Sequence, residues 1–286
     1  MQLRSPYGAR DGVTLRRADW KSVVWALGLL VVSATLIFAH DLFLKPESFF
    51  LPPQSDVRIA VLNGSFTASE ASVTPDRLRD LSLVGPTGRQ PLAHDAWTPQ
   101  GDSTWLAVHT GAAGTYLIGA SLFPRALTLP AAEFNAYLKE DGIPDVLEAR
   151  TRAGVLDRPA RERYQKHVKT LLQVGDVRSD AYAGVLGYPA ELVPLSNPYA
   201  ARVGETIAFR CLVDGRPAAH QLVVAGGEQR GTPIAERSAR SDSGGVVRFT
   251  FESAGKWYVK FIHMEPVSHD SVDYESKWAT LTFELR

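Results

Sequence analysis

The chain has 286 residues, 45% of them hydrophobic, and its 31 basic and 31 acidic side chains balance. Residues 40–286 carry 26 basic and 29 acidic side chains, a balance that favours neither nucleic acid nor an anionic membrane surface as a partner. This stretch is long enough to bury one large hydrophobic core or two modest ones, and we predict two.

The first 39 residues are typical of a secretory signal peptide. Five basic residues precede an apolar run at 23–38, and Ala39 stands where a signal peptidase would cut. Cleavage there predicts an exported, periplasmic protein whose mature chain begins at His40. The alternative is an uncut leader: the sixteen apolar residues are short for a membrane span, but Trp25 and the basic flank would hold them in the membrane as an anchor.

The remaining sequence predicts a mainly β protein with two β-sandwich, immunoglobulin-like domains and a helical insert between them. An N-terminal β-sandwich is expected at 40–129, from short apolar or alternating runs at 57–62, 81–84, 105–108 and 116–120. A C-terminal immunoglobulin-like β-sandwich is expected at 181–286, with candidate strands at 206–213, 221–225, 246–252, 257–264 and 278–285. The only cysteine, Cys211, falls in the first of these strands, so we expect a buried, inert thiol and no disulfide.

A change of hydrophobic period marks the helical insert at 130–180. One helix is expected before Gly142 and a second between Pro144 and Gly154. A third is expected to end at Gly175, with an apolar face of Tyr164, Val168, Leu171 and Leu172. Its other face is interpreted as a solvated surface, formed by Arg161, Glu162, Arg163, Lys166 and Lys169.

A mature chain that begins with histidine has a metal-binding group at its first residue. The free α-amine and a ring nitrogen of His40 can close a small chelate on one metal ion. We expect His263 to add a third nitrogen, because it ends the alternating strand at 257–264, where a side chain can leave the core. His269, in a polar loop, is a further candidate ligand, and Asp41 and Glu265 are candidates to orient the imidazoles.

Simpler interpretations stay open for these residues. A histidine in line with apolar residues, as His263 is, is often a structural residue at the edge of a core. The loop that contains His269 also has the composition of an exposed connection, and Asp41 and Glu265 would then be surface charges. The remaining histidines have no partner at ligand spacing and are interpreted as structural or solvated; they are His94, His109, His167 and His220.

Several specific segments carry a resemblance to a known family. They are 40–46 (HDLFLKP), 134–142 (FNAYLKEDG), 162–164 (ERY) with 171–175 (LLQVG), 191–194 (ELVP), 197–199 (NPY), 262–264 (IHM) and 275–283 (ESKWATLTF). In these segments residues 40–286 resemble a NikM-like bacterial family of unknown function that is described as the periplasmic component of cobalt or nickel uptake. The resemblance implies an exported protein tied to transition-metal handling.

We therefore expect a periplasmic, non-enzymatic protein that binds a divalent transition metal and passes it to a membrane importer or another envelope protein. Nickel or cobalt is expected, and copper or zinc also suits imidazole ligands. No catalytic residues and no organic cofactor site are predicted, since the sequence has neither a Gly-rich phosphate loop nor a nucleophile elbow.

Two other interpretations remain open. One is a metal-free interaction module that presents its loops to a transporter or a cell-wall component. The other is a copper-dependent oxidative enzyme, because an N-terminal histidine with a second histidine is the arrangement of oxidative polysaccharide-cleaving enzymes.

Overall fold

The structure is a computed structural model that describes residues 1–2, 40–268 and 271–286. The chain divides into Met1–Phe38 and one compact unit, Ala39–Arg286, and only the second is discussed below. The predicted leader lies almost entirely outside the described residues. Within the part of the chain that the structure describes, no helix is both long and apolar enough to cross a membrane.

The described part of the compact unit is mainly β, as predicted, and its strands form three sheets. The first sheet has the order β1 (Asp41–Pro46), β3 (Asp56–Gly64), β7 (Ser103–His109), β6 (Trp97–Gln100). The third sheet contains β11 (Ala190–Pro194), β12 (Thr206–Val213), β13 (Arg216–Pro217) and β16 (Val246–Thr250).

The central sheet joins strands from both ends of the compact unit. Its order is β15 (Thr232–Arg240), β14 (Leu222–Gln229), β17 (Gly255–Pro266), β18 (Tyr274–Leu285), β10 (Ala160–Val174), β8 (Gly114–Leu122), β4 (Leu78–Gly85), β5 (Gly88–Pro91). Two short strands, β2 (Phe50–Leu51) and β9 (Arg125–Leu129), also pair with β10. The boundaries expected at 129 and 180 therefore fall inside one compact unit whose central sheet takes strands from both sides of them.

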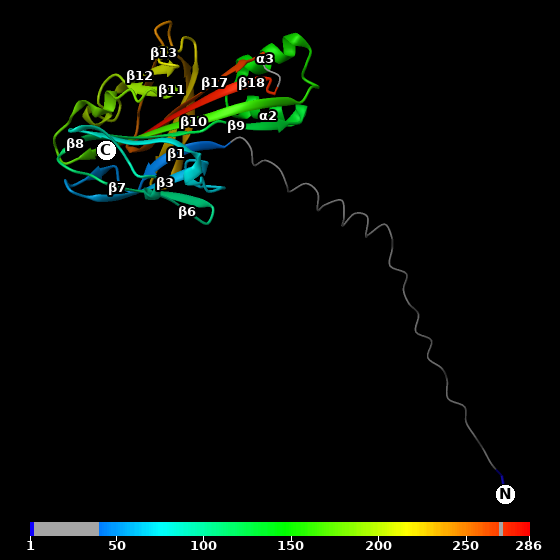
Figure 1. Cartoon of the computed structure of the whole chain (residues 1–286), viewed down its shortest axis with the longest axis horizontal. Coiled ribbons are helices and arrows are strands. Elements are labelled where there is room, and N and C mark those ends of the chain that lie inside the picture. Colours follow the sequence, from blue (N-terminus) through cyan, green and yellow to red (C-terminus); the bar gives the residue numbers. More distant parts are fainter. Residues whose placement is uncertain (3–39, 269–270) are drawn as a thin grey trace. The chain divides into compact units, whose positions relative to one another are not determined.

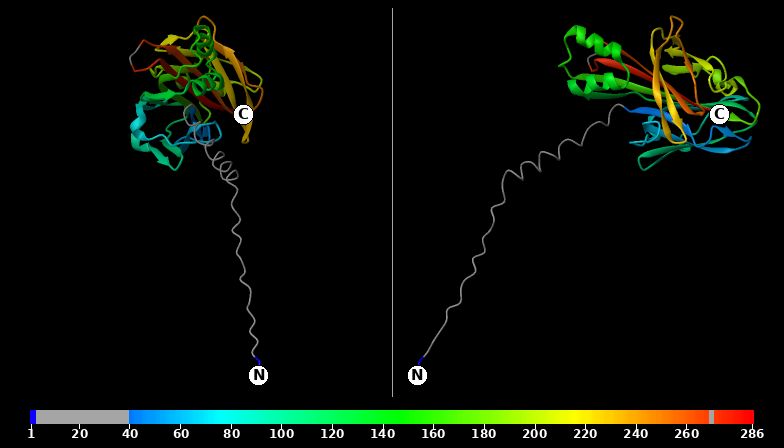
Figure 2. Two further views of the ribbon diagram at one scale, coloured as in Figure 1. Left: turned by 90° about the vertical axis from the view of Figure 1, so that its right-hand side faces the viewer. Right: turned by 180° about the vertical axis from the view of Figure 1, so that it is seen from behind.

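The central sheet is covered on both faces (Figure 1). Alternate side chains of a strand point to opposite faces, and neighbours on β10 enter different cores. Leu171 packs with Phe209 and other residues of the third sheet, whereas Leu172 packs with Ile59 and other residues of the first sheet. Figure 2 shows the same order of layers from two further directions.

Most predicted strands are confirmed, and Cys211 is buried as expected. Its thiol is fully enclosed in the core beneath the third sheet, and burial raises its pKa to about 12. A thiol with this pKa stays protonated at neutral pH, which agrees with an inert residue.

The two helices before Gly154 are also confirmed. They are α2 (Ala131–Glu140) and α3 (Pro144–Ala153), and Gly154 ends α3 in the left-handed conformation at φ +65°. Their buried side chains, among them Phe134 and Leu138, pack on Met264 and Trp278 of the central sheet. Short 3₁₀ turns complete the structure at Pro75–Arg77, His94–Ala96, Asp180–Ala183 and Pro198–Ala200.

The third predicted helix is wrong. Residues 160–174 form β10, which pairs in parallel with β18 and antiparallel with β8 and β9. Because both faces of β10 are buried, its apolar residues show no alternation with polar ones, and their spacing also fits a helix. The predicted solvated face is wrong for three of its residues, since Glu162, Lys166 and Lys169 are buried.

Glu162 connects α2 to the central sheet from a buried position. Tyr137 Oη donates a hydrogen bond of 3.0 Å to Glu162 Oε1, and Ser276 Oγ donates to the same oxygen. The other carboxyl oxygen, Oε2, is buried without a hydrogen-bond partner among the described residues. Burial raises the pKa of Glu162 to about 7, so this carboxyl is protonated in about half of the molecules at neutral pH.

Lys169 and Glu191 connect β10 to the third sheet as a buried ion pair. Their side chains are 3% and 1% exposed. Glu191 also accepts hydrogen bonds from the backbone N–H groups of Leu186, Gly187 and Tyr188, at 2.7–2.9 Å. The Glu191 carboxylate thus has both a buried cation and three N–H donors as partners.

Replacing Glu162 by Gln should change how stability depends on pH. The folded-state pKa of about 7 lies above the ordinary value of 4.5, so the folded protein binds this proton more tightly than the unfolded chain does. The contribution of Glu162 to stability is therefore present below pH 4.5 and is lost as pH rises to 7, by about 3 kcal/mol. In urea unfolding at several pH values, Glu162→Gln should gain on the wild type between pH 5 and 8. A constant difference between the two proteins would contradict the raised pKa.

Replacing Lys169 by Met should strongly destabilise the protein. The substitution leaves the Glu191 carboxylate buried without its cation, which costs about 3–5 kcal/mol. Arg163→Met is the matched control, because Arg163 pairs with Glu275 at a more exposed site where an ion pair contributes about 0–1 kcal/mol. Urea unfolding at pH 7 measures the free energy of unfolding of both variants. Equal losses would show that the buried pair stabilises the fold no more than the exposed pair does.

Candidate functional site

His40 lies directly before β1, at the start of the compact unit. Its side chain is 20% exposed, and its ring Nε2 lies 2.8 Å from Glu70 Oε2. The contact is at ion-pair distance, although the ring N–H is not aligned with the oxygen as in a straight hydrogen bond. The main-chain carbonyl of His40 accepts a hydrogen bond from Lys166 Nζ. Both the ring and the backbone of His40 are therefore held by other parts of the chain.

A tight connection after β3 places Glu70 beside His40. Gly64 and Ser69 form an isolated β-bridge, and the Glu70 N–H donates to Asn63 O at 3.0 Å. A Cβ at Gly64 would come within 2.6 Å of Ala68 O, so only glycine fits this close approach. Sequence reasoning missed Glu70, because a single acidic residue in a polar stretch gives no signal of what it faces.

Asp41 is paired with a lysine instead of an imidazole. Its Oδ2 lies 2.5 Å from Lys260 Nζ, and both side chains are largely buried. Asp141 lies near this pair, and burial, followed by the charge of Asp41, raises the pKa of Asp141 to about 8. Burial also lowers the pKa of Lys166 to about 8. Ionisable groups from β1, β10, β17 and the residue that follows α2 thus gather around the start of β1.

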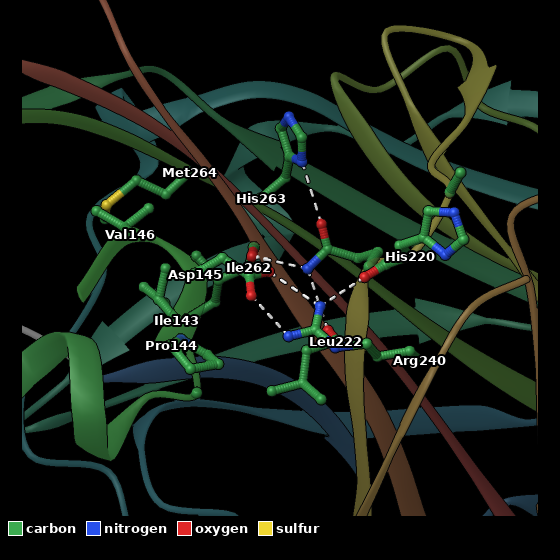
Figure 3. A pocket seen from close by; sticks show the side chains of 13 residues that line it. Ile143, Pro144, Asp145, Val146, His220, Leu222, Arg240, Ile262, His263 and Met264 are labelled. Atoms are coloured by element: carbon green, nitrogen blue, oxygen red, sulfur yellow. Dashed lines mark hydrogen bonds and ion pairs between the residues drawn. The ribbon is translucent and has the colours of Figure 1, made fainter. Parts of the chain in front are cut away.

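His263 lies in a different environment, on β17 (Figure 3). Its Nδ1 is 3.1 Å from Gln221 Oε1. The Gln221 amide nitrogen donates to the carbonyls of Leu222 and Ile262, so its oxygen faces the ring and His263 Nδ1 is the donor. Burial lowers the pKa of His263. The predicted partner Glu265 is 4.0 Å from Nε2, beyond hydrogen-bond distance.

A cavity of about 470 Å³ adjoins His263. It lies between the start of α3 and the ends of β14 and β17 and is lined by His220 and Met264 among others. An ion pair between Arg240 and Asp145, with contacts of 2.7 and 2.9 Å, also borders it (Figure 3). His220 has a positive φ of 57°, which is uncommon outside glycine.

The structure does not bring His40 and His263 together. Lys260 and His263 are three residues apart on β17, so their side chains leave the sheet on opposite faces. Lys260 reaches Asp41, the neighbour of His40, whereas His263 shares the face of Phe261. His269 lies outside the described residues, and within those residues no group of three or more His, Cys, Asp or Glu side chains is arranged to hold a metal ion.

Three of the segments that carry the family resemblance, 134–142, 162–164 and 275–283, meet near His40. Tyr137, from the segment at 134–142, hydrogen-bonds Glu162 and stacks on Trp278 with ring centroids 6.1 Å apart. Lys166, which holds the His40 carbonyl, lies 5.2 Å from the centre of the Trp278 ring. These segments are far apart in sequence, and their convergence marks this region as the candidate functional site.

The other histidines have separate surroundings. His167 is buried beside Ser121 Oγ at 2.9 Å, and burial lowers its pKa to about 3. His109 is exposed and pairs with Asp56 at 2.8 Å. Their positions agree with a structural role for His167 and a solvated one for His109.

The solved structures that match this chain share little of its sequence. No curated protein matches the chain at a significant level. Among solved structures, latent PorU from Porphyromonas gingivalis is 11% identical, and the match covers 84% of this chain and 20% of that chain with a TM-score of 0.21. The chain thus spans about a fifth of the PorU chain.

Two further matches have similar values. The D0-D1 domain of intimin is 9% identical, with coverage of 84% and 96% and a TM-score of 0.21. A segment of two fibronectin type-III domains from chicken tenascin is 11% identical, with coverage of 85% and 97% and a TM-score of 0.21.

A protein family matches most of the chain, from residue 37 to residue 265. The match includes His40, Glu70 and the segments at 134–142 and 162–164, and it ends before the segment at 275–283. The chain belongs to the family described as "Domain of unknown function (DUF4198)".

Proposed function

We propose that the mature protein begins at His40, works in the periplasm and binds a divalent transition metal through this residue. Nickel or cobalt is the proposed metal, and a membrane importer is the proposed recipient. The observation that carries the proposal is the contact of 2.8 Å between His40 Nε2 and Glu70 Oε2, which occupies one ring nitrogen and leaves Nδ1 for a metal. The NikM-like resemblance of the segments around His40 agrees with this assignment.

Cleavage after Ala39 would complete the donor set. It creates a free α-amine on His40, and the α-amine and Nδ1 of one histidine can close a small chelate ring. An imidazole that ligates a metal commonly contacts a carboxylate through its other nitrogen, as His40 does with Glu70. Both nitrogen donors suit nickel, cobalt, copper and zinc.

The geometry supports this chelate without His263. Since His263 leaves β17 on the face opposite to Lys260 and Asp41, it would need a rearranged sheet to reach a metal at His40. Two protein nitrogens leave several coordination positions of a metal open to solvent or to another protein. Such an open site fits transfer of the metal better than permanent storage.

Selectivity would not come from affinity alone. Nitrogen ligands bind copper more tightly than nickel or cobalt, so the metal carried would depend on the supply in the periplasm and on the partner. The structure therefore supports His40 as the chelating residue more directly than it supports nickel or cobalt as the metal.

Metal titration into two forms of the protein tests the chelate. One form begins at His40 and the other has a single glycine ahead of it, which removes the α-amine from the ring. Calorimetry with nickel, cobalt and copper should detect binding by the first form and at least a tenfold weaker affinity for the second. His263→Ala in the first form is the control and should bind as the parent does.

The outcomes separate the alternatives. Equal binding by both forms would move the site away from the terminus, and a loss of binding in His263→Ala would restore His263 as a ligand. Absence of binding by either form would overturn the metal function and favour a metal-free interaction module.

A further inference from the structure

We infer that Glu70 is a positioning residue for His40: it holds the proton on Nε2 and so directs Nδ1 toward the α-amine of the mature chain. The inference rests on the proposed function and names the residue that selects the ligating nitrogen. Glu70 is not itself offered as a ligand, because its carboxylate lies against Nε2, on the side of the ring away from the chelating atoms.

The contact between Glu70 and the His40 ring favours one tautomer of that ring. A carboxylate 2.8 Å from a ring nitrogen favours the tautomer in which that nitrogen carries the proton. The lone pair of a neutral His40 is then on Nδ1, the ring nitrogen closest to the main chain. His40 Nε2 is buried without a hydrogen-bond partner among the described residues, and the Glu70 carboxylate lies at ion-pair distance from it, so the charge of Glu70 is what favours a proton on this nitrogen.

His40 and Glu70 are both held in place through Lys166 and Asn63. Lys166 Nζ donates to the carbonyl of His40 and also to Asn63 Oδ1, at 3.2 Å. Asn63 in turn holds Glu70 through its main-chain oxygen at 3.0 Å. One lysine from β10 therefore ties the residue that chelates to the loop that orients it.

The ring of His263 is held through its other nitrogen, Nδ1. Gln221 accepts from His263 Nδ1, which leaves the lone pair of that ring on Nε2. The two histidines that the sequence nominated thus have opposite tautomers. Only the tautomer of His40 suits a chelate with its own α-amine.

The test combines ring tautomers with metal affinity in the protein that begins at His40. Nitrogen-15 NMR of histidine-labelled, metal-free protein at pH 8 reports which ring nitrogen carries the proton. We expect Nε2–H for His40 and Nδ1–H for His263, and the second signal is an internal reference. Nickel titration of the same samples gives the affinity.

Three variants separate orientation from charge. Glu70→Ala should lose the preference for Nε2–H at His40 and weaken nickel binding about 10- to 100-fold. Glu70→Gln keeps an oxygen acceptor and should retain the tautomer and most of the affinity. Glu47→Ala is the matched control, because Glu47 is similarly exposed and pairs with Arg58, and it should change neither reading.

Two results would overturn the inference. One is a proton on Nδ1 of His40 in the wild type, and the other is a Glu70→Ala variant with unchanged tautomer and unchanged nickel affinity. A wild type with Nε2–H that binds no nickel would instead overturn the proposed function, while the orienting contact of Glu70 would stand.

Discussion

The structure depends on one strand that has to satisfy both faces and both edges at once. β10 pairs with β18 on one side and with β8 and β9 on the other, and it separates two hydrophobic cores. Side chains of its partner β18 hold β1 in turn. Thr280 Oγ1 donates to Leu42 O at 2.8 Å, and Thr282 Oγ1 donates to Leu44 O at 2.5 Å. The position of β1, and with it of His40, therefore follows from the pairing of β10 with β18.

The buried charges of β10 determine what packs on each of its faces. On one face Lys169 binds Glu191 and fixes the third sheet. On the other face Glu162 binds Tyr137 of α2, and Lys166 binds the His40 carbonyl. A buried polar group costs free energy unless it is hydrogen-bonded, so each of these residues allows only the neighbour that satisfies it. Polar contacts in the core thus give the layers their register, and hydrophobic burial supplies the stability.

The candidate site is built at the edge of this scaffold, around His40 directly before β1. His40 is held at its ring by Glu70 and at its carbonyl by Lys166, and the next residue is held by Lys260. These three contacts on two consecutive residues fix the start of β1 to the rest of the fold. A chelate with preset geometry would lose less conformational entropy when it binds a metal, which suits the proposed role in metal binding and transfer.

The amino-acid sequence alone determined the features that depend on local pattern. Alternation at 57–62 and 206–213 predicted strands, and the Gly142, Pro144 and Gly154 signals predicted α2 and α3, because turn and cap residues act within a few positions. It also singled out His40, because the predicted leader ends just before this residue. Only the tertiary structure decided the rest. β10 was taken for a helix since a strand buried on both faces has no alternating pattern. The separation of His40 from His263 and the approach of Glu70 depend on which face of β17 each side chain leaves and on a loop that folds back on β3. Neither is encoded in sequence spacing, because contacts between distant residues are set by strand pairing and layer packing.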